Sequence, residues 1–351
     1  MHDNIEQETL TPKENLTKGA IARRPLLLLL PYIFLLCVTG ATRTQDPAEP
    51  PFTLKQLGPN VWAAISNPKA KAPAGANAGF LIGDDGVAVI DTFASAEAAK
   101  QLLAEIRKLT KLPVKFVINT HYHVDHVAGN GVFVDAGAVT LAQTNVRGWI
   151  HTENLKFFGQ NRNGAAGVKN EIKPEQKAFV EGLGAPMVVY DQAVDLYLGS
   201  HEIQIRSFPG HTGGDSVALI PDTKTAFGGD LFWRNTLPNL IDASTKPWID
   251  TLDTLAKNLP GYTFVPGHGD VGNAQDLGAF REYLATLRKL VADSQAQGKS
   301  GDALVQAVSP QLAEKYGQWN FFKYFAERNI LDTDAELSGK KRIPQAQHRK
   351  E

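Results

Sequence analysis

The sequence predicts a mixed α/β (α+β) fold in which helices cover β-sheets. Three observations favour this class: strand-like and helical segments alternate in both halves of the chain, 43% of the residues are hydrophobic, and glycine-rich turns follow several apolar runs. The 351 residues suit one large domain or two small ones with a buried core.

The first half of the chain contains four predicted strands and a helix. Residues 80–91 (FLIGDDGVAVID) predict two short strands around an Asp-Gly turn. Residues 95–109 predict an amphipathic helix with a serine as its N-cap. The apolar runs 114–119 and 138–143 predict two further strands. The polar stretch from about 150 to 185 has no firm period, and we predict no element there.

The second half begins with strands and ends mainly in helices. Strands, a hairpin, an amphipathic helix and a last strand are expected, in this order, over 187–191, 194–198, 202–208, 216–230 (hairpin), 247–259 (helix) and 262–270. The helical part that follows has an apolar stripe, which we assign to core packing; it consists of Phe280, Leu284, Leu287 and Val291.

The N-terminus has the order of a secretory signal. An arginine pair precedes an apolar stretch, 25–38, which is followed by small residues and then by a polar segment with proline. We expect a signal peptide over 1–41, a linker over 42–52, and a periplasmic or secreted protein. The alternative is a retained segment that anchors the protein to the membrane, although the apolar stretch is short and interrupted by proline.

The cysteine content limits the possible metal ligands, and the net charge limits the possible partners. Cys37 is the single cysteine and lies within the predicted signal, so the mature protein would have neither a disulfide nor a thiolate ligand. Any metal must then be held by His, Asp or Glu. The formal net charge of -1 provides no basic field for nucleic acid, so we expect a small-molecule substrate and no nucleic-acid partner, and no membrane partner after signal cleavage.

The stretch 119–130 (NTHYHVDHVAGN) follows an apolar strand and is rich in candidate metal ligands. His121 and His123 are two positions apart, so they share a side on an extended segment and not on a helix. Asp125 and His126 are adjacent and would diverge. A single metal is therefore not expected to take all four, and two metals with further ligands from elsewhere fit better.

Three more candidates follow strands and have glycine beside them. They are His211 in SFPGHTGGDS, Asp230 in AFGGDLF and His268 in TFVPGHGDV. The other histidines have no such context and are assigned to the surface or to packing; they are His2, His151, His201 and His348.

These motifs, in this order, resemble those of the metallo-β-lactamase superfamily: VIDT with Asp91, HxHxDH, PGHTGGDS, GGD and VPGHG. The resemblance covers roughly residues 53–275. It implies a four-layer αββα sandwich with a metal site at one edge between the sheets. We expect residues 276–351 to form a helical C-terminal extension that packs on the same domain.

The resemblance also implies two groups of ligands. The first metal would be bound by His121, His123 and His211, and the second by Asp125, His126 and His268. Asp230 would bridge both metals, and Asp91 would orient the ligand loop from behind. Imidazoles with few carboxylates suit two zinc ions, with iron as the alternative.

The expected activity is that of an exported binuclear zinc hydrolase. A metal-bridging hydroxide would cleave an ester, lactone, thioester or amide, with Asp125 and Asp230 as the catalytic carboxylates. One alternative is a true metallo-β-lactamase, in which Arg234 and Asn239 would contact the substrate. Asp230 stands where that branch uses cysteine, which favours the hydrolase. The other alternative is an oxidoreductase of the persulfide dioxygenase type with a single iron.

Overall fold

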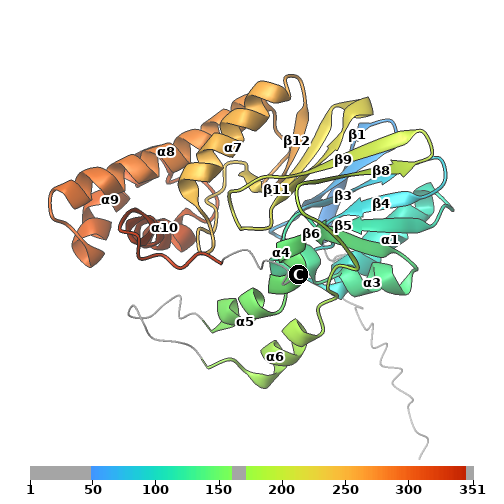
Figure 1. Cartoon of the computed structure of the whole chain (residues 1–351), viewed down its shortest axis with the longest axis horizontal. Helices are drawn as coiled ribbons and strands as arrows, with labels where there is room; N and C mark the ends of the chain where they lie inside the picture. Colours follow the sequence, from blue (N-terminus) through green and yellow to red (C-terminus); the bar gives the residue numbers. More distant parts are fainter. Residues whose placement is uncertain (1–48, 160–170, 345–351) are drawn as a thin grey trace, which may run out of the picture. The chain divides into compact units, whose positions relative to one another are not determined.

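Two β-sheets and the helices that cover them make up the described part of the chain (Figure 1). The computed structural model describes residues 49–159 and 171–344. The predicted signal segment, with Cys37, and the first part of the predicted linker lie outside these residues. Helices pack on the outer faces of both sheets, so the predicted αββα sandwich with a helical C-terminus is confirmed.

The first sheet has seven strands that lie in chain order. They are β1 (Phe52–Gly58), β2 (Val61–Ser66), β3 (Ala78–Ile82), β4 (Val87–Ile90), β5 (Val114–Ile118), β6 (Val139–Gln143) and β7 (Val188–Tyr190). The strands β1 to β4 are antiparallel neighbours, whereas β4 to β7 are parallel. Parallel neighbours need crossover connections, and α1 (Ala96–Leu109) supplies the one between β4 and β5.

The second sheet has five strands in the order β12-β11-β10-β9-β8. They are β8 (Ala193–Leu198), β9 (His201–Ser207), β10 (Ser216–Ile220), β11 (Thr225–Trp233) and β12 (Thr263–His268). Only β11 and β12 are parallel, and their ladder shifts register on both sides of Gly229. Such irregularities bend a strand and redirect its side chains.

Three apolar layers hold the sandwich together. Residues of both sheets, such as Ile90 and Ile205, form the layer between them. α1 and α3 (Asn130–Asp135) cover the outer face of the first sheet. On the outer face of the second sheet lie α7 (Thr245–Asn258) and α8 (Ala274–Ala296). The last two helices, α9 (Gly301–Tyr316) and α10 (Phe322–Leu337), pack on α8 in the same apolar cluster.

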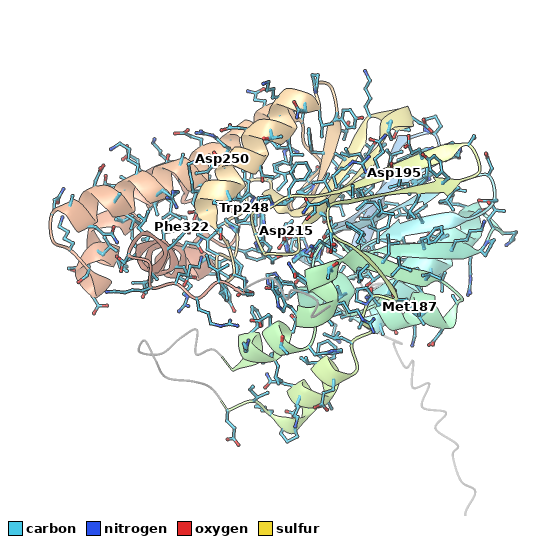
Figure 2. All side chains as sticks on the ribbon, viewed as in Figure 1. Met187, Asp195, Asp215, Trp248, Asp250 and Phe322 are labelled. Carbon is cyan, nitrogen blue, oxygen red and sulfur yellow. The ribbon has the colours of Figure 1, made fainter. Side chains whose placement is uncertain are left out.

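The helices of the C-terminal part share one core with the second sheet. Trp248 of α7, labelled in Figure 2, is fully buried and donates a hydrogen bond from its indole nitrogen to the carbonyl of Leu231, at 2.9 Å. The predicted apolar stripe of α8 is buried in the same cluster, so its assignment to core packing is confirmed.

Most elements predicted from the sequence are present, and the structure adds several that were not predicted. Ser95 caps α1 by accepting a hydrogen bond from the backbone nitrogen of Ala98, as expected. The strands β1 and β2 were not predicted. The stretch without a firm period contains α5 (Thr152–Phe158) and α6 (Pro174–Glu181), and α4 (Thr144–Trp149), also not predicted, ends just before it. These helices are short, so few turns display a period.

No helix in the described part of the chain is long and apolar enough to cross a membrane.

Candidate metal centre

The motif 119–130 lies directly after β5 and supplies ligand candidates on two sides. His121 and His123 belong to an extended segment, with His123 at φ -60° and ψ 143°. The short helix α2 (Val124–Val127) begins at the next residue, and its Asp125 and His126 gather with His268 instead of joining that pair. The predicted divergence of Asp125 from His126 is wrong, because the single turn of α2 brings Asp125 Oδ2 to 3.9 Å from His126 Nε2, within one group of donors. The motif as a whole still supplies ligand candidates to two different groups.

Two groups of side chains converge at this edge of the sandwich. The first donor group consists of His121, His123 and His211, and the second of Asp125, His126 and His268. Asp230, from the irregular part of β11, adjoins the first group and also contacts the second. The structure thus brings together every ligand candidate named from the sequence.

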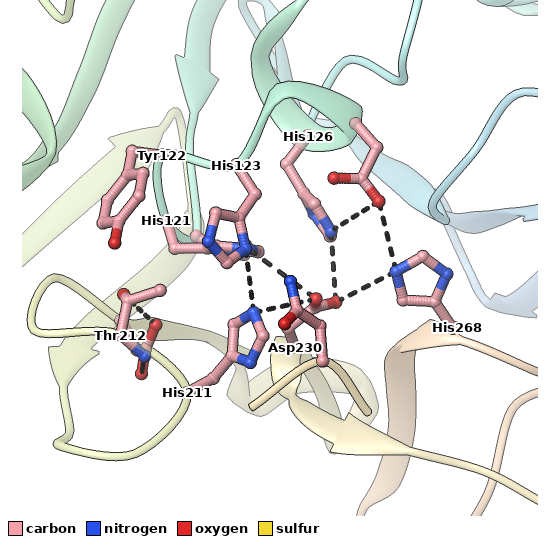
Figure 3. Close-up of polar contacts among 12 residues, drawn as sticks. His121, Tyr122, His123, His126, His211, Thr212, Asp230 and His268 are labelled. Carbon is pink, nitrogen blue, oxygen red and sulfur yellow. Dashed lines mark hydrogen bonds and ion pairs between the residues drawn. The ribbon is translucent and has the colours of Figure 1, made fainter. Parts of the chain in front are cut away.

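Asp230 lies between the two donor groups with one oxygen facing each (Figure 3). Its Oδ2 is 3.1 Å from His211 Nε2 and 3.7 Å from His121 Nε2. Its Oδ1 is 3.1 Å from His126 Nε2 and 3.4 Å from His268 Nε2. This is the arrangement that a carboxylate bridging two cations requires.

Several polar atoms at the centre have no hydrogen-bond partner among the described residues. They are His121 Nε2, His126 Nε2, His268 Nε2 and Asp230 Oδ1, and all are buried. Buried polar atoms are rarely left unsatisfied unless an ion or a water completes their shell. Because these atoms also point at one another across 3–4 Å, the residues fit a pair of divalent cations.

The two donor groups differ in charge. Burial, followed by the neighbouring imidazole of His126, lowers the pKa of His121, and burial also lowers that of His211. Burial opposes protonation of His268 too, but Asp230 and Asp125 outweigh it and raise its pKa to about 9. The pKa of His126 is raised for the same reason, with Asp230 as the main partner that overcomes burial.

Asp91 supports the segment that carries His121 and His126 through hydrogen bonds to Thr120 and a contact with His126. Its Oδ1 accepts a hydrogen bond from the backbone nitrogen of Thr120 at 2.8 Å, and its Oδ2 accepts one from Thr120 Oγ1 at 2.7 Å. The same Oδ2 lies 2.8 Å from His126 Nδ1, which leaves Nε2 of that ring facing the centre. Asp91 itself has φ of 57°, a region that costs free energy for a residue other than glycine.

Asp242 supports a histidine of the first donor group, as Asp91 supports one of the second. It was not identified from the sequence. It is buried, accepts a hydrogen bond from Tyr122 Oη at 2.7 Å, and has Oδ2 3.4 Å from His123 Nε2. Lys341 donates to the carbonyls of Leu240 and Ala243, both at 2.6 Å, and so secures the loop on either side of Asp242. No motif or spacing marks Asp242 or Lys341 in the sequence. The one signal for Asp242 is that an aspartate directly follows two apolar residues.

Two glycines let the backbone approach the centre. A Cβ on Gly267 would lie 1.9 Å from Asp230 Oδ1. Gly229 has φ of 49°, and a Cβ there would lie 2.3 Å from Thr120 Oγ1. Both positions therefore require glycine, which explains the GGD and PGHG patterns.

A cavity of about 330 Å³ opens over the centre. Asn239, predicted to contact substrate, is among its lining residues, together with Asn154. Arg234 is not: its Nε is 3.0 Å from Asp276 Oδ1 and its Nη1 donates to the carbonyl of Val271. The structure does not bring Arg234 to the cavity, because this ion pair holds its side chain elsewhere.

The two remaining histidines that the structure describes do not line the cavity. His151 Nε2 is 2.9 Å from the carbonyl oxygen of Leu183, and His201 Nδ1 is 3.0 Å from Asp222 Oδ2 on the surface. His2 and His348 lie outside the described residues.

Comparisons with known proteins show the family to which the chain belongs. Residues 72–268 match the family model described as the metallo-beta-lactamase superfamily. The chain is 24% identical to a linear primary-alkylsulfatase of Pseudomonas sp., over 66% of the chain but only 51% of that relative. It is 26% identical to a hydroxyacylglutathione hydrolase of Brucella ovis (67% and 82%) and 25% identical to the probable metallo-hydrolase YqgX of Bacillus subtilis (59% and 93%).

A solved structure supports the fold. A metallo-beta-lactamase from Pontibacter korlensis superimposes with a TM-score of 0.54 at 22% identity, covering 67% of this chain and 99% of that one. The family resemblance predicted from the motifs is thereby confirmed, and the chain belongs to the metallo-β-lactamase superfamily.

Proposed function

We propose that the protein is a binuclear zinc hydrolase that cleaves a neutral ester or lactone, with thioesters and amides as related substrates. The observation that carries the proposal is Asp230, whose two oxygens each face one donor group at 3.1 Å. Its relatives include an alkylsulfatase and a hydroxyacylglutathione hydrolase, both of which cleave bonds with water.

The donor set favours zinc, because neutral imidazoles with few carboxylates suit this metal. When bound, two zinc ions would supply Lewis acidity and an activated water. Asp125 has 29% of its side chain exposed and lines the cavity, whereas Asp230 is buried. Despite its partial burial, His126 and His268 lower the pKa of Asp125, so its carboxylate would stay ionised and accept a hydrogen bond from that water, while Asp230 would join the two donor groups.

Elemental analysis of protein purified without added metal tests this part of the proposal. We expect about two zinc ions per chain, with loss of activity on chelation and recovery on adding zinc. A single tightly held iron with no second metal would instead favour the oxidoreductase of the persulfide dioxygenase type.

A true β-lactamase is the second candidate, and the cavity gives it less support. Such an enzyme must seat a substrate carboxylate, and the lining residues that the structure describes include no lysine or arginine. Turnover of one cephalosporin, one neutral lactone, one aryl ester and one primary alkyl sulfate separates the candidates. We expect the lactone and the aryl ester to be cleaved and the cephalosporin to be slow or untouched.

We also propose that the protein is exported and acts in the periplasm or outside the cell on a small molecule, with neither nucleic acid nor membrane as a partner after signal cleavage. The proposal is supported by the arginine pair and the apolar stretch 25–38. Intact-mass measurement of protein from the periplasm or medium should show loss of about the first 40 residues. A full-length product in the cytosol would overturn it, and a full-length product in the membrane would favour the anchored alternative.

A further inference from the structure

We propose that the cavity selects substrates with an apolar chain, which lies against aromatic side chains contributed largely by the start of α10. This inference rests on the proposed hydrolase function and names the substrate class of the same site. The aromatic side chains are called the aromatic wall and comprise Phe157, Trp233, Phe321, Tyr324 and Phe325.

The aromatic wall comes from three separate parts of the fold. Phe157 lies on α5 and Trp233 at the end of β11, whereas the other three rings belong to the turn before α10 and to its first residues. Trp233 stacks on His268 with ring centroids 4.0 Å apart. The wall therefore begins at a metal-ligand candidate and extends away from it.

Phe321 has a strained backbone conformation that neighbouring hydrogen bonds maintain. Its φ is 60°, which is uncommon for a bulky residue and persists only where surrounding structure enforces it. The neighbouring Asn320 donates to the carbonyl of Asn235 and accepts from the backbone nitrogen of Leu237, both at 2.9 Å. These bonds hold the turn before α10, where the Phe321 ring lies 6.3 Å from that of His268.

The aromatic wall exposes apolar surface to the cavity and contains no cationic side chain. Phe321 is 45% exposed and Tyr324 65% exposed although both line a cavity. The charged lining side chains within the described residues are those of the candidate metal centre. Asn154 already bonds the backbone of Tyr122 and Val124. A polar or anionic chain would lose hydration there, whereas an apolar chain would cover the exposed rings.

A homologous series of lactones with alkyl side chains from methyl to heptyl tests the proposal on the zinc-loaded protein. Burial of one methylene corresponds to about a fourfold gain, so kcat/KM should rise by about that factor per methylene until the cavity is filled. Titration calorimetry with 1-butanol and 1-octanol supplies a readout independent of turnover. We expect 1-octanol to bind at least about tenfold more tightly.

Two variants and a matched control test whether the chain-length dependence comes from the aromatic wall. Phe321→Asn removes a ring with a residue that tolerates the left-handed backbone, and Tyr324→Ala removes an exposed one. Each should reduce the gain per methylene to below about twofold and weaken 1-octanol binding. Tyr197→Ala is the control, because this residue of β8 is 62% exposed but does not line the cavity, and its chain-length dependence should match wild type.

The outcomes separate the two proposals. Lactone turnover that is independent of chain length, with equal binding of the two alcohols, would overturn the aromatic-wall proposal and leave the hydrolase standing. Absence of lactone and ester turnover, with tighter 1-octanol binding that is lost in Tyr324→Ala, would overturn the hydrolase proposal and support the wall.

Discussion

The two donor groups share one edge of the sandwich but differ in composition, charge and support. The first has three imidazoles, two of which have lowered pKa values through burial. The second includes Asp125, and its imidazoles have raised pKa values because carboxylates surround them. Asp242 supports the first at 3.4 Å, and Asp91 supports the second at 2.8 Å.

Because of this difference, we expect that mutations can weaken metal binding in one donor group without weakening it equally in the other. A buried aspartate lies behind one histidine of each group, and these aspartates come from different loops. Partners of this kind fix the orientation of a ligand ring and typically affect metal affinity by 10–100-fold. Variants of each support should therefore weaken one metal more than the other, and only the bridge should weaken both.

The largest effect is expected at the bridge. Asp230→Ala removes the oxygens that face both groups, so metal content should fall below one ion per chain and kcat/KM should fall at least about a hundredfold. Metal analysis and kinetics on the same preparation measure it. Retention of two metals and full activity would show that the bridging assignment is wrong.

Asp230→Cys adds a test of the β-lactamase candidate. A gain in cephalosporin turnover together with a loss of ester turnover would favour that candidate.

Asp91→Asn should weaken the second donor group selectively. The amide keeps the size of the side chain but presents at most one carbonyl oxygen, so it cannot support His126 and both Thr120 donors together. We expect the affinity for one of the two metals to fall about 10–100-fold while the other stays within about threefold. Competition with a chromogenic chelator resolves the two constants. Equal weakening of both would contradict separate support.

Asp242→Asn should have the same kind of effect on the first donor group, at the lower end of that range. Its contact with His123 is longer, and the carboxylate is shared with Tyr122. A roughly tenfold loss of affinity for the other metal is expected in the same chelator assay. Tyr122→Phe is the control, since it removes the shared hydroxyl and leaves Asp242 facing His123. If Asp242→Asn weakens the metal affected by Asp91→Asn, the pairing of supports with groups is wrong.

Lys341→Met tests how far the support of Asp242 depends on the C-terminal segment. The variant loses two charge-assisted hydrogen bonds to Leu240 and Ala243, so the free energy of unfolding should fall by about 2–4 kcal/mol and the affinity of the first group by less than tenfold. Denaturant unfolding and the chelator assay measure both. The exposed neighbour Lys340→Met is the matched control and should behave as wild type.

Arg234→Ala should have the smallest effect on the reaction. Because Asp276 and Val271 hold its side chain outside the cavity, turnover of a neutral lactone should stay within about threefold of wild type. Kinetics with the lactone and one cephalosporin measure it. Efficient cephalosporin hydrolysis in wild type that collapses in this variant would revive the β-lactamase candidate.

The sequence by itself determined the family, the αββα layers and the ligand candidates. His121 and His123 alternate on an extended segment, and His211 and His268 follow strands beside glycines, so short-range spacing carries their geometry. The helix α1 and the apolar stripe of α8 were likewise predictable, because a period of 3.6 residues is visible over several turns.

Only the tertiary structure decided what surrounds the ligands. Asp242, Lys341 and Phe321 belong to loops and helix ends without periodicity, and they meet residues about 50–120 positions earlier in the chain. Arg234 looked available in the sequence, but a partner on α8 holds it away from the cavity. Contacts of this kind depend on how the helices pack on the second sheet, and packing is a sum of many small contacts that no local pattern encodes.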